Sequence, residues 1–364
     1  MTPVGSVRSI FTTTTNQKKS EPMSKKTAYK VAMVGATGAV GETLLGILAE
    51  RKFPVSELVP LASARSAGGK VEFGGKSITV QDLAKYDFAG VDIAFFSAGG
   101  KVSREHAPRA AAAGAVVIDN TSEFRYQDDI PLVVSEVNPK DIAQYTKRRI
   151  IANPNCSTMQ MLVALAPLHR TVGIERINVA TYQSVSGAGR SGLEELGKQT
   201  AALLRFEQVK PVKFTKQIAF NVIPHIDDFQ ENGYTKEEMK MVWETRKILG
   251  DPEIQVNPTA VRVPVFYGHA EAVHVETKVK ISAADARKLL GDAPGVVVID
   301  RHEAGGYPTP VGDAAGKDPV YVGRIREDIS HPRGLDLWVV ADNIRKGAAL
   351  NAVQVAELLV KSYL

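Results

Sequence analysis

The period of apolar and polar positions changes several times along the chain, and each change marks a predicted element. Residues 30–34 form a short apolar run that ends in glycines, and residues 39–50 place their apolar side chains on one helical stripe. This pattern predicts a strand, a glycine-rich turn and a helix. The same criteria predict strands at 58–62, 91–96, 116–118 and 132–137, a hairpin at 71–80 that turns at Gly74 and Gly75, and a helix at 103–113. Strands that alternate with helices are typical of a doubly wound, Rossmann-like α/β domain.

After Asn153 the pattern changes to longer alternating segments with fewer helices between them. These segments lie at 176–185, 217–223, 259–280, 296–300, 320–326 and 335–340. They predict an α+β domain built on a largely antiparallel sheet. Thr235 and Glu238 have capping-box spacing and predict a helix start. Residues 347–360 predict an amphipathic helix, which we expect to pack back on the first domain.

These patterns divide the chain into an extension and two domains. The first 22 residues lack the apolar core of a signal peptide and only weakly resemble a transit peptide, so we expect a disordered extension over residues 1–27. The first domain is predicted at 28–153, completed by the C-terminal residues 343–364. The second is predicted at 154–342.

Composition and charge exclude several classes of protein. A length of 364 residues fits about two domains, and 44% hydrophobic with 23% charged residues excludes fibrous and wholly disordered chains. The net charge of +5 arises entirely within residues 1–30, so the body offers no basic surface for nucleic acid. No apolar run is suited to crossing a membrane. The single cysteine excludes an internal disulfide and a multi-cysteine zinc site, and it favours a reduced, cytoplasmic setting without a metal.

Three glycines spaced three apart, Gly35, Gly38 and Gly41, lie where the first strand meets the first helix. Backbone N–H groups at such a turn can bind a pyrophosphate, although the spacing departs from G-x-G-x-x-G and a simple tight turn is the alternative. After the second strand, where an NAD enzyme has an acidic residue, this chain has Arg65 between hydroxyl residues. A cation there favours NADP, and a solvated loop arginine is the alternative.

Cys156 lies at a predicted helix start, in a polar segment with Asn155, Ser157 and Thr158. The helix dipole at this position favours the thiolate, so we expect a lowered thiol pKa and a nucleophile. A buried structural cysteine is the alternative.

A nucleophile also needs a base, and His269 is one candidate. Arg262 and His269 are seven residues apart, so a regular strand would point them to opposite faces. Pro264 and Gly268 are breaks that could bring them together, and a hydrogen-bonded structural histidine is the alternative.

Several segments in register resemble the aspartate-β-semialdehyde dehydrogenase family, most closely its shorter bacterial branch. The resemblance runs from about Tyr29 to the C-terminus and rests on residues 35–41, 62–66, 154–158, 181–189, 218–224, 237–240 and 262–265, and on Asp342 with Asn343. It implies a reversible NADP-dependent conversion of L-4-aspartyl phosphate to L-aspartate 4-semialdehyde and phosphate, in the pathway to lysine, threonine and methionine. It also implies a homodimer paired through the second domain.

The resemblance implies roles for individual residues. Cys156 would form a thioester, His269 would act as general acid and base, and Gln183 would position the substrate. Arg262 would bind the α-carboxylate and Glu237 the α-ammonium, with Asn155 also in the substrate site. Arg125 and Lys240 would bind phosphate. From spacing alone, an exposed i,i+3 ion pair is the alternative for Glu237 and Lys240. The implied cofactor residues are Gly35, Thr37, Gly38, Ala39, Val40, Gly41, Ser63, Arg65, Ser66, Ser186, Gly187 and Asn343.

Three rival functions remain open at this point. One is a related acyl-phosphate reductase, such as one for N-acetylglutamyl phosphate, or a glyceraldehyde-phosphate-type dehydrogenase. Another is a thiol hydrolase or acyltransferase without a cofactor. The third is a non-catalytic NADP-binding scaffold.

Overall fold

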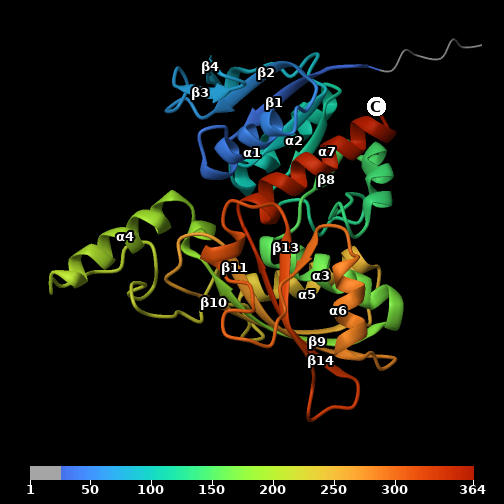
Figure 1. Ribbon diagram of the computed structural model, residues 1–364. Coiled ribbons are helices and arrows are strands. Elements are labelled where there is room, and N and C mark those ends of the chain that lie inside the picture. The colour runs from blue at the N-terminus through green and yellow to red at the C-terminus, as the bar shows by residue number, and fades with distance from the viewer. Residues whose placement is uncertain (1–25) are drawn as a thin grey trace, which may run out of the picture.

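Two six-stranded sheets with their helices make up the molecule (Figure 1). The computed structural model describes residues 26–364, so residues 1–25 of the predicted extension lie outside the described residues. The expected α/β architecture of two domains is confirmed.

The first sheet is entirely parallel and has the order β5-β2-β1-β6-β7-β8. Its strands are β1 (Tyr29–Val34), β2 (Val55–Ala62), β5 (Gln81–Asp82), β6 (Ile93–Phe96), β7 (Val116–Asp119) and β8 (Ile150–Ala152). The helices α1 (Ala39–Glu50) and α2 (Gly100–Ala112) connect them, and the predicted hairpin is formed by β3 (Lys70–Phe73) and β4 (Lys76–Thr79). Continuous apolar strands such as β6 fit a sheet that is covered on both faces.

The C-terminal helix α7 (Asn351–Ser362) packs on the first domain, as predicted. Val353, Ala356 and Leu359 share a buried cluster with Leu44 and Leu48 of α1. Figure 1 shows α7, in red, lying beside the blue α1 although the two are some 300 residues apart in the chain. A π-helical segment, Arg345–Leu350, precedes α7, so the α-helix starts later than the sequence pattern predicted.

The second sheet has the order β10-β9-β11-β14-β13-β12. Its three central pairings are antiparallel and its two outer pairings are parallel, which agrees with the predicted largely antiparallel sheet. The strands are β9 (Ile174–Gln183), β10 (Gln255–Arg262), β11 (His269–Thr277), β12 (Val296–Val298), β13 (Val320–Glu327) and β14 (Gly334–Ala341).

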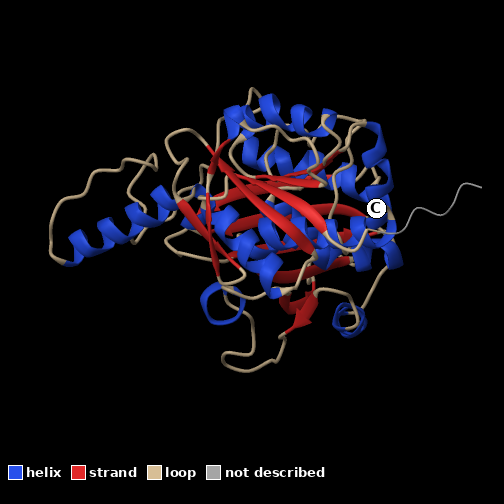
Figure 2. Ribbon diagram, turned by 90° about the horizontal axis from the view of Figure 1, so that it is seen from above, coloured by secondary structure: helices blue, strands red, loops and turns tan. Residues whose placement is uncertain are grey.

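Three helices, α3 (Cys156–Val172), α5 (Lys236–Leu249) and α6 (Ala283–Gly291), pack against strands of this sheet. The long α3 is apolar and almost wholly buried, because it packs between the two sheets and shares one core cluster with both. Helix α4 (Arg190–Leu204) instead projects from the body, as Figures 1 and 2 show.

Two predicted strands are wrong, and side-chain amides explain both. At 132–137 the Asn138 amide accepts from the N–H of Val134 and donates to the carbonyl of Leu132, which leaves one isolated bridge in place of a strand. At 217–223 the side-chain oxygen of Gln199 accepts hydrogen bonds from the N–H groups of Ile218 and Ala219. Such local bonds compete with a sheet ladder.

The prediction of one continuous strand segment at 259–280 is also wrong, because this region contains parts of two separate strands, β10 and β11. The two strands flank β9 on opposite sides. The break between them contains Pro264 and Gly268.

None of the helices within residues 26–364 is long and apolar enough to cross a bilayer. The same residues contain no group of three or more His, Cys, Asp or Glu side chains that could hold a metal ion.

Candidate active site

Cys156 is the first residue of α3, as the polar segment around it predicted. Asn155 is the N-cap, and its side-chain oxygen accepts from the backbone N–H groups of Ser157 and Thr158 at 3.0 and 3.3 Å. The thiol is partly exposed. It therefore lies at a capped helix start.

The predicted lowering of the thiol pKa is wrong for the free protein. Burial and then the Glu237 carboxylate raise the pKa of Cys156 to about 12, and together they outweigh the opposing effect of nearby arginines. The thiol is therefore protonated at neutral pH in the free protein.

Gln183 ends β9 and turns its amide into this region. Its Nε2 donates to the Ser157 hydroxyl at 3.0 Å and to Glu237 Oε1 at 3.2 Å. The side chain is 1% exposed. An amide on an otherwise apolar strand face therefore has polar partners next to the thiol.

Helix α5 supplies Glu237 and Lys240 from one face. The capping box of Thr235 and Glu238 fixes its first turn, as predicted. Lys240 Nζ lies 2.9 Å from Glu237 and 2.7 Å from Asp227, and Asn155 donates to Glu237 at 2.9 Å. Burial opposes ionisation of Glu237, yet Lys240 and these hydrogen bonds lower its pKa to about 2. Glu237 is buried and Lys240 is partly buried, so the alternative of an exposed pair is excluded.

His269 begins β11 and is wholly buried. The Ser184 backbone N–H donates to its Nδ1 at 3.1 Å. Because a backbone amide can only donate, Nδ1 is the acceptor and a neutral ring carries its proton on Nε2. Burial and then the Arg262 cation lower the pKa of His269 to about 3, so the ring is neutral at physiological pH. Nε2 has no hydrogen-bond partner within the described part of the chain.

Arg262 and His269 meet because β10 and β11 lie on either side of β9. Arg262 Nη1 donates to the Ser184 carbonyl at 2.7 Å, while His269 bonds to the N–H of the same residue. Gly187 covers both side chains. A Cβ there would lie 3.0 Å from Arg262 Nη1 and 3.4 Å from His269 Nε2, so only glycine leaves this space open.

Arg125 lies in the loop after β7 and is 6% exposed. Its Nη1 is 3.0 Å from Glu244 of α5, and its Nη2 donates to the Asn120 carbonyl at 2.9 Å. The Glu244 carboxylate also accepts from the Asn155 backbone N–H at 2.6 Å. The loop of the first domain and the start of α3 are therefore tied to one residue.

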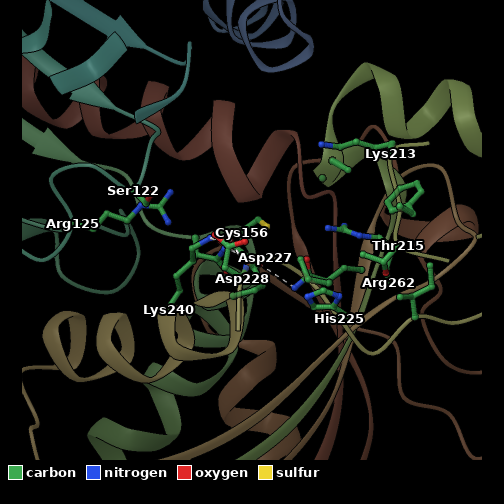
Figure 3. Close-up of a pocket in the computed structure, with 18 residues that line it drawn as sticks. Ser122, Arg125, Cys156, Lys213, Thr215, His225, Asp227, Asp228, Lys240 and Arg262 are labelled. Atoms are coloured by element: carbon green, nitrogen blue, oxygen red, sulfur yellow. Dashed lines mark hydrogen bonds and ion pairs between the residues drawn. The ribbon is translucent and has the colours of Figure 1, made fainter. Parts of the chain in front are cut away.

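Most of these side chains surround a cavity of about 630 Å³, with Arg125 and Lys240 on one side of Cys156 and Arg262 with His225 on the other (Figure 3). The lining does not include His269, which is wholly buried. The cavity brings together eight of the predicted site residues, namely Arg125, Asn155, Cys156, Gln183, Gly187, Glu237, Lys240 and Arg262. Its wall also contains residues that the sequence analysis missed, among them Ser122, Lys213, His225 and Asp227. They lie on loops outside the predicted motifs, so spacing gave no signal for them.

The glycine-rich turn has the form expected of a phosphate-binding loop. Gly35 has a φ of +88°, and a Cβ there would lie 2.6 Å from the Ser97 carbonyl oxygen. Gly38 is the N-cap of α1 and provides no side-chain cap, which leaves the helix start open to an anion. Thr37, Ala39 and Val40 complete the turn and are partly exposed. The residues present therefore fit a dinucleotide.

The predicted 2′-phosphate loop lies beside this turn. The Gly35 N–H donates to the Leu61 carbonyl near the end of β2, so Ser63, Arg65 and Ser66 follow at the same sheet edge. Ser63 and Arg65 are exposed and Ser66 is partly exposed.

A segment near the C-terminus links the turn to the thiol. Residues 345–350 contact both α1 and α3, and a Cβ on Gly347 would lie 2.6 Å from the Cβ of Cys156. Asn343 accepts from the hydroxyls of Ser184 and Ser186 at 3.0 and 3.1 Å. Asn343 and Ser186 are thus brought together beside His269.

We expect Glu237→Gln to make the thiol more reactive. Since the Glu237 carboxylate raises the pKa of Cys156 toward about 12, its removal lowers that pKa and enlarges the small thiolate fraction at pH 8. The rate of alkylation by iodoacetamide at pH 8 should rise by about fivefold or more, since one pKa unit is a factor of ten in thiolate. In both proteins the rate should climb with pH beyond 9.

Glu238→Gln is the matched control, because Glu238 is a buried glutamate of the same helix and glutamine also completes a capping box. An equal alkylation rate in the two variants would contradict this account of the thiol.

Comparisons with known proteins agree with this geometry. Residues 30–145 match the family model described as semialdehyde dehydrogenase, NAD binding domain, and residues 165–346 match semialdehyde dehydrogenase, dimerisation domain. The aspartate-semialdehyde dehydrogenase of Legionella pneumophila is 61% identical over 92% of this chain and 96% of its own length. Aspartate-semialdehyde dehydrogenase 2 of Vibrio cholerae is 62% identical over 92% of this chain and 98% of its own length.

Solved structures give the same result. Aspartate semialdehyde dehydrogenase II of Vibrio cholerae, complexed with ASA, has a TM-score of 0.91 and 60% identity, covering 93% of this chain and 100% of that one. The Candida albicans aspartate semialdehyde dehydrogenase with NADP has a TM-score of 0.70 and 26% identity, covering 91% of this chain and 98% of that one.

The two sheets, the glycine-rich turn and the buried thiol site define a two-domain semialdehyde dehydrogenase, an oxidoreductase that uses a nicotinamide cofactor. Within that class, the chain belongs to the aspartate-semialdehyde dehydrogenase family.

Proposed function

We propose that this protein converts L-4-aspartyl phosphate to L-aspartate 4-semialdehyde and phosphate, reversibly and with NADPH, through a thioester on Cys156. The observation that carries the proposal is the cavity in which one thiol lies with the buried carboxylate of Glu237 and three cations, the buried Arg125 and Arg262 and the partly buried Lys240. An amino acid with an acyl phosphate offers the complementary charges. Relatives named for this activity over more than nine tenths of the chain support the assignment.

In the first step the Cys156 sulfur attacks the acyl carbon, a C–S bond forms, the C–O bond to phosphate breaks, and the thiol proton leaves with the phosphate. Glu237 would pair with the α-ammonium and Arg262 with the α-carboxylate. Because Glu237 holds the thiol pKa high in the free protein, the arriving ammonium would offset that charge and favour the thiolate. Arg125 and Lys240 would hold the departing phosphate, and Gln183 and Asn155 would fix the acyl group beside the sulfur.

In the second step the acyl group is reduced. Bound nicotinamide supplies the hydride. His269, neutral and with its proton on Nε2, would donate a hydrogen bond to the oxyanion that develops on the former carbonyl. When the C–O double bond reforms, the C–S bond breaks and Cys156 leaves as the thiolate, so the reaction stops at the aldehyde.

The test is the reverse reaction with aspartate semialdehyde, phosphate and NADP, followed as the absorbance of NADPH. We expect reduction that requires both phosphate and the semialdehyde. N-acetylglutamate semialdehyde and glyceraldehyde 3-phosphate should be poor substrates, because neither combines a free ammonium and an α-carboxylate for Glu237 and Arg262. Faster turnover with either compound would favour the rival reductases.

Within the nicotinamide class, we propose NADP as the cofactor. The exposed Arg65 with Ser63 and Ser66, at the edge of the glycine-rich turn, supports this cofactor, since an arginine fork suits a 2′-phosphate.

The match to a dimerisation domain supports a homodimer. A free catalytic thiol supports a reducing, cytoplasmic location.

We expect Arg65→Ala to weaken NADPH binding by about tenfold or more, because a charge-assisted hydrogen bond to phosphate contributes about 1.5 to 3 kcal/mol. NADH lacks that phosphate, so its dissociation constant should change by less than about twofold. Fluorescence titration measures both. The control is Lys70→Ala, an exposed cation at the start of β3. Equal losses for NADPH and NADH would argue against the 2′-phosphate site.

A further inference from the structure

The Glu244 side chain on α5 joins two parts of the active site that come from different domains. It is 0% exposed. Its Oε1 lies 3.0 Å from Arg125 Nη1 and 3.3 Å from the Tyr126 hydroxyl, and its Oε2 accepts from the Asn155 backbone N–H at 2.6 Å. One carboxylate therefore contacts the loop after β7 and the residue that immediately precedes the thiol.

We propose that Glu244 is a positioning residue that holds Arg125 at a fixed place relative to Cys156, so that the phosphate leaving group is aligned with the attacking sulfur. This inference rests on the proposed function, because it assumes that Arg125 binds the phosphate. It assigns Glu244 no contact with the substrate.

The donor groups of Arg125 support the proposal. Arg125 Nη1 donates to the Glu244 carboxylate, and Arg125 Nη2 donates to the Asn120 carbonyl. The buried Nε of Arg125 has no hydrogen-bond partner among residues 26–364. Arg125 also lines the cavity. Hydrogen bonds through Nη1 and Nη2 fix the orientation of this guanidinium, and Nε remains available as a donor. The group therefore needs no reorientation to bind an oxyanion.

The position of Glu244 along α5 explains how this helix holds both Arg125 and the start of α3 in place. Glu237, Lys240 and Glu244 are spaced three and four residues apart, so one helix face carries all three. Lys240 donates to Glu237, Glu237 also accepts from the Asn155 side chain, and Glu244 accepts from Arg125. Because Asn155 bonds to Glu237 through its side chain and to Glu244 through its N–H, α5 fixes the start of α3 at two points.

The charge of Glu244 gives the proposal a sharp alternative. If Glu244 only neutralised Arg125, removing its charge would strengthen the attraction of the site for phosphate. If Glu244 positions Arg125, removing the charge frees the guanidinium and weakens phosphate binding. The two accounts predict opposite signs.

The experiment compares Glu244→Gln with Glu238→Gln in the full chain. With aspartate semialdehyde, NADP and varied phosphate, Glu244→Gln should raise the KM for phosphate by about tenfold, the loss typical of one well-placed charged contact. The KM for NADP should stay within about twofold. Glu238 is a buried glutamate of the same helix that bonds to Thr235 and Ala260 and does not line the cavity, so Glu238→Gln should leave both KM values unchanged. An unchanged or lowered KM for phosphate in Glu244→Gln would overturn the proposal.

A second readout does not depend on turnover. Inorganic phosphate should protect Cys156 from iodoacetamide in the wild-type protein, and Glu244→Gln should need about tenfold more phosphate for the same protection. If the wild type binds phosphate in this assay but does not reduce NADP with aspartate semialdehyde, the proposed function fails while the role of Glu244 is still tested. If Glu244→Gln does not fold, Glu244→Asp keeps the charge but shortens its reach, and it should show the same loss of phosphate affinity. Wild-type affinity in Glu244→Asp would then overturn the proposal.

Discussion

Cys156→Ala abolishes turnover, with an expected fall in kcat of about 10⁴-fold or more, the effect of removing a nucleophile that works as a unit with its neighbours. The sulfur forms the bond that displaces phosphate, and no other cysteine exists in the chain to replace it. The methyl group of alanine fits the space at the first position of α3 and keeps the Asn155 cap. Folding and NADPH binding should therefore remain, which a thermal melt and a fluorescence titration check.

The assay for this variant is phosphate-dependent NADP reduction with aspartate semialdehyde. A second test uses mass spectrometry, because the wild type mixed with an acyl phosphate should gain the mass of the acyl group on the peptide that contains Cys156. Substantial activity in Cys156→Ala would rule out the thioester route.

His269→Asn should lower kcat by about 10² to 10⁴-fold, the range for a positioned proton donor. The ring is held through Nδ1 by the Ser184 N–H, which leaves Nε2 for the developing oxyanion. Asparagine can still reach the Ser184 N–H but lacks the second ring nitrogen. Because the ring takes part in the transition state more than in binding, the KM for aspartate semialdehyde should change by less than about threefold.

The control for this variant is His169→Asn, near the far end of the helix that Cys156 begins. His169 faces Asp251 and does not line the cavity, so kcat should stay within about twofold of the wild-type value.

The acidic side of the profile of kcat against pH gives a further check. Since the pKa of His269 is lowered to about 3, its ring stays neutral as the pH falls from 8 to 5, and its protonation should cause no loss of activity in that range. A loss near pH 6.5 that disappears in His269→Asn would contradict the buried neutral ring.

Local patterns predicted the elements whose cause is local. The strand, glycine-rich turn and helix at 29–50 follow from periodicity, and the start of α5 follows from the capping box of Thr235 and Glu238. The wrong strands at 132–137 and 217–223 have the right apolar pattern. These segments do not form strands, because their backbone N–H groups donate to the side chains of Asn138 and Gln199 in place of a neighbouring strand.

The candidate site shows the same division. The helix start at Cys156 was predictable from its polar neighbours. The meeting of Arg262 and His269 depended on two breaks in the sequence and on β9 lying between their strands, which is a property of the sheet order. The thiol pKa was predicted in the wrong direction, because the helix dipole is visible in the sequence and the Glu237 carboxylate beside the thiol is not. Glu244 was missed for the same reason, since its partner Arg125 comes from a distant segment, and Asp227 was missed because it pairs with Lys240 from a loop without a recognisable pattern.

The position of α7 has a consequence for how the chain is made. The cluster that holds β1 and α1 in place is completed by side chains of α7. Ribosomes release a chain from its N-terminus onward, and domains usually fold in that order. Here the first domain keeps an open apolar face until α7 has been synthesised, so β1 and α1 reach their native packing only after the segments of the second domain have been translated.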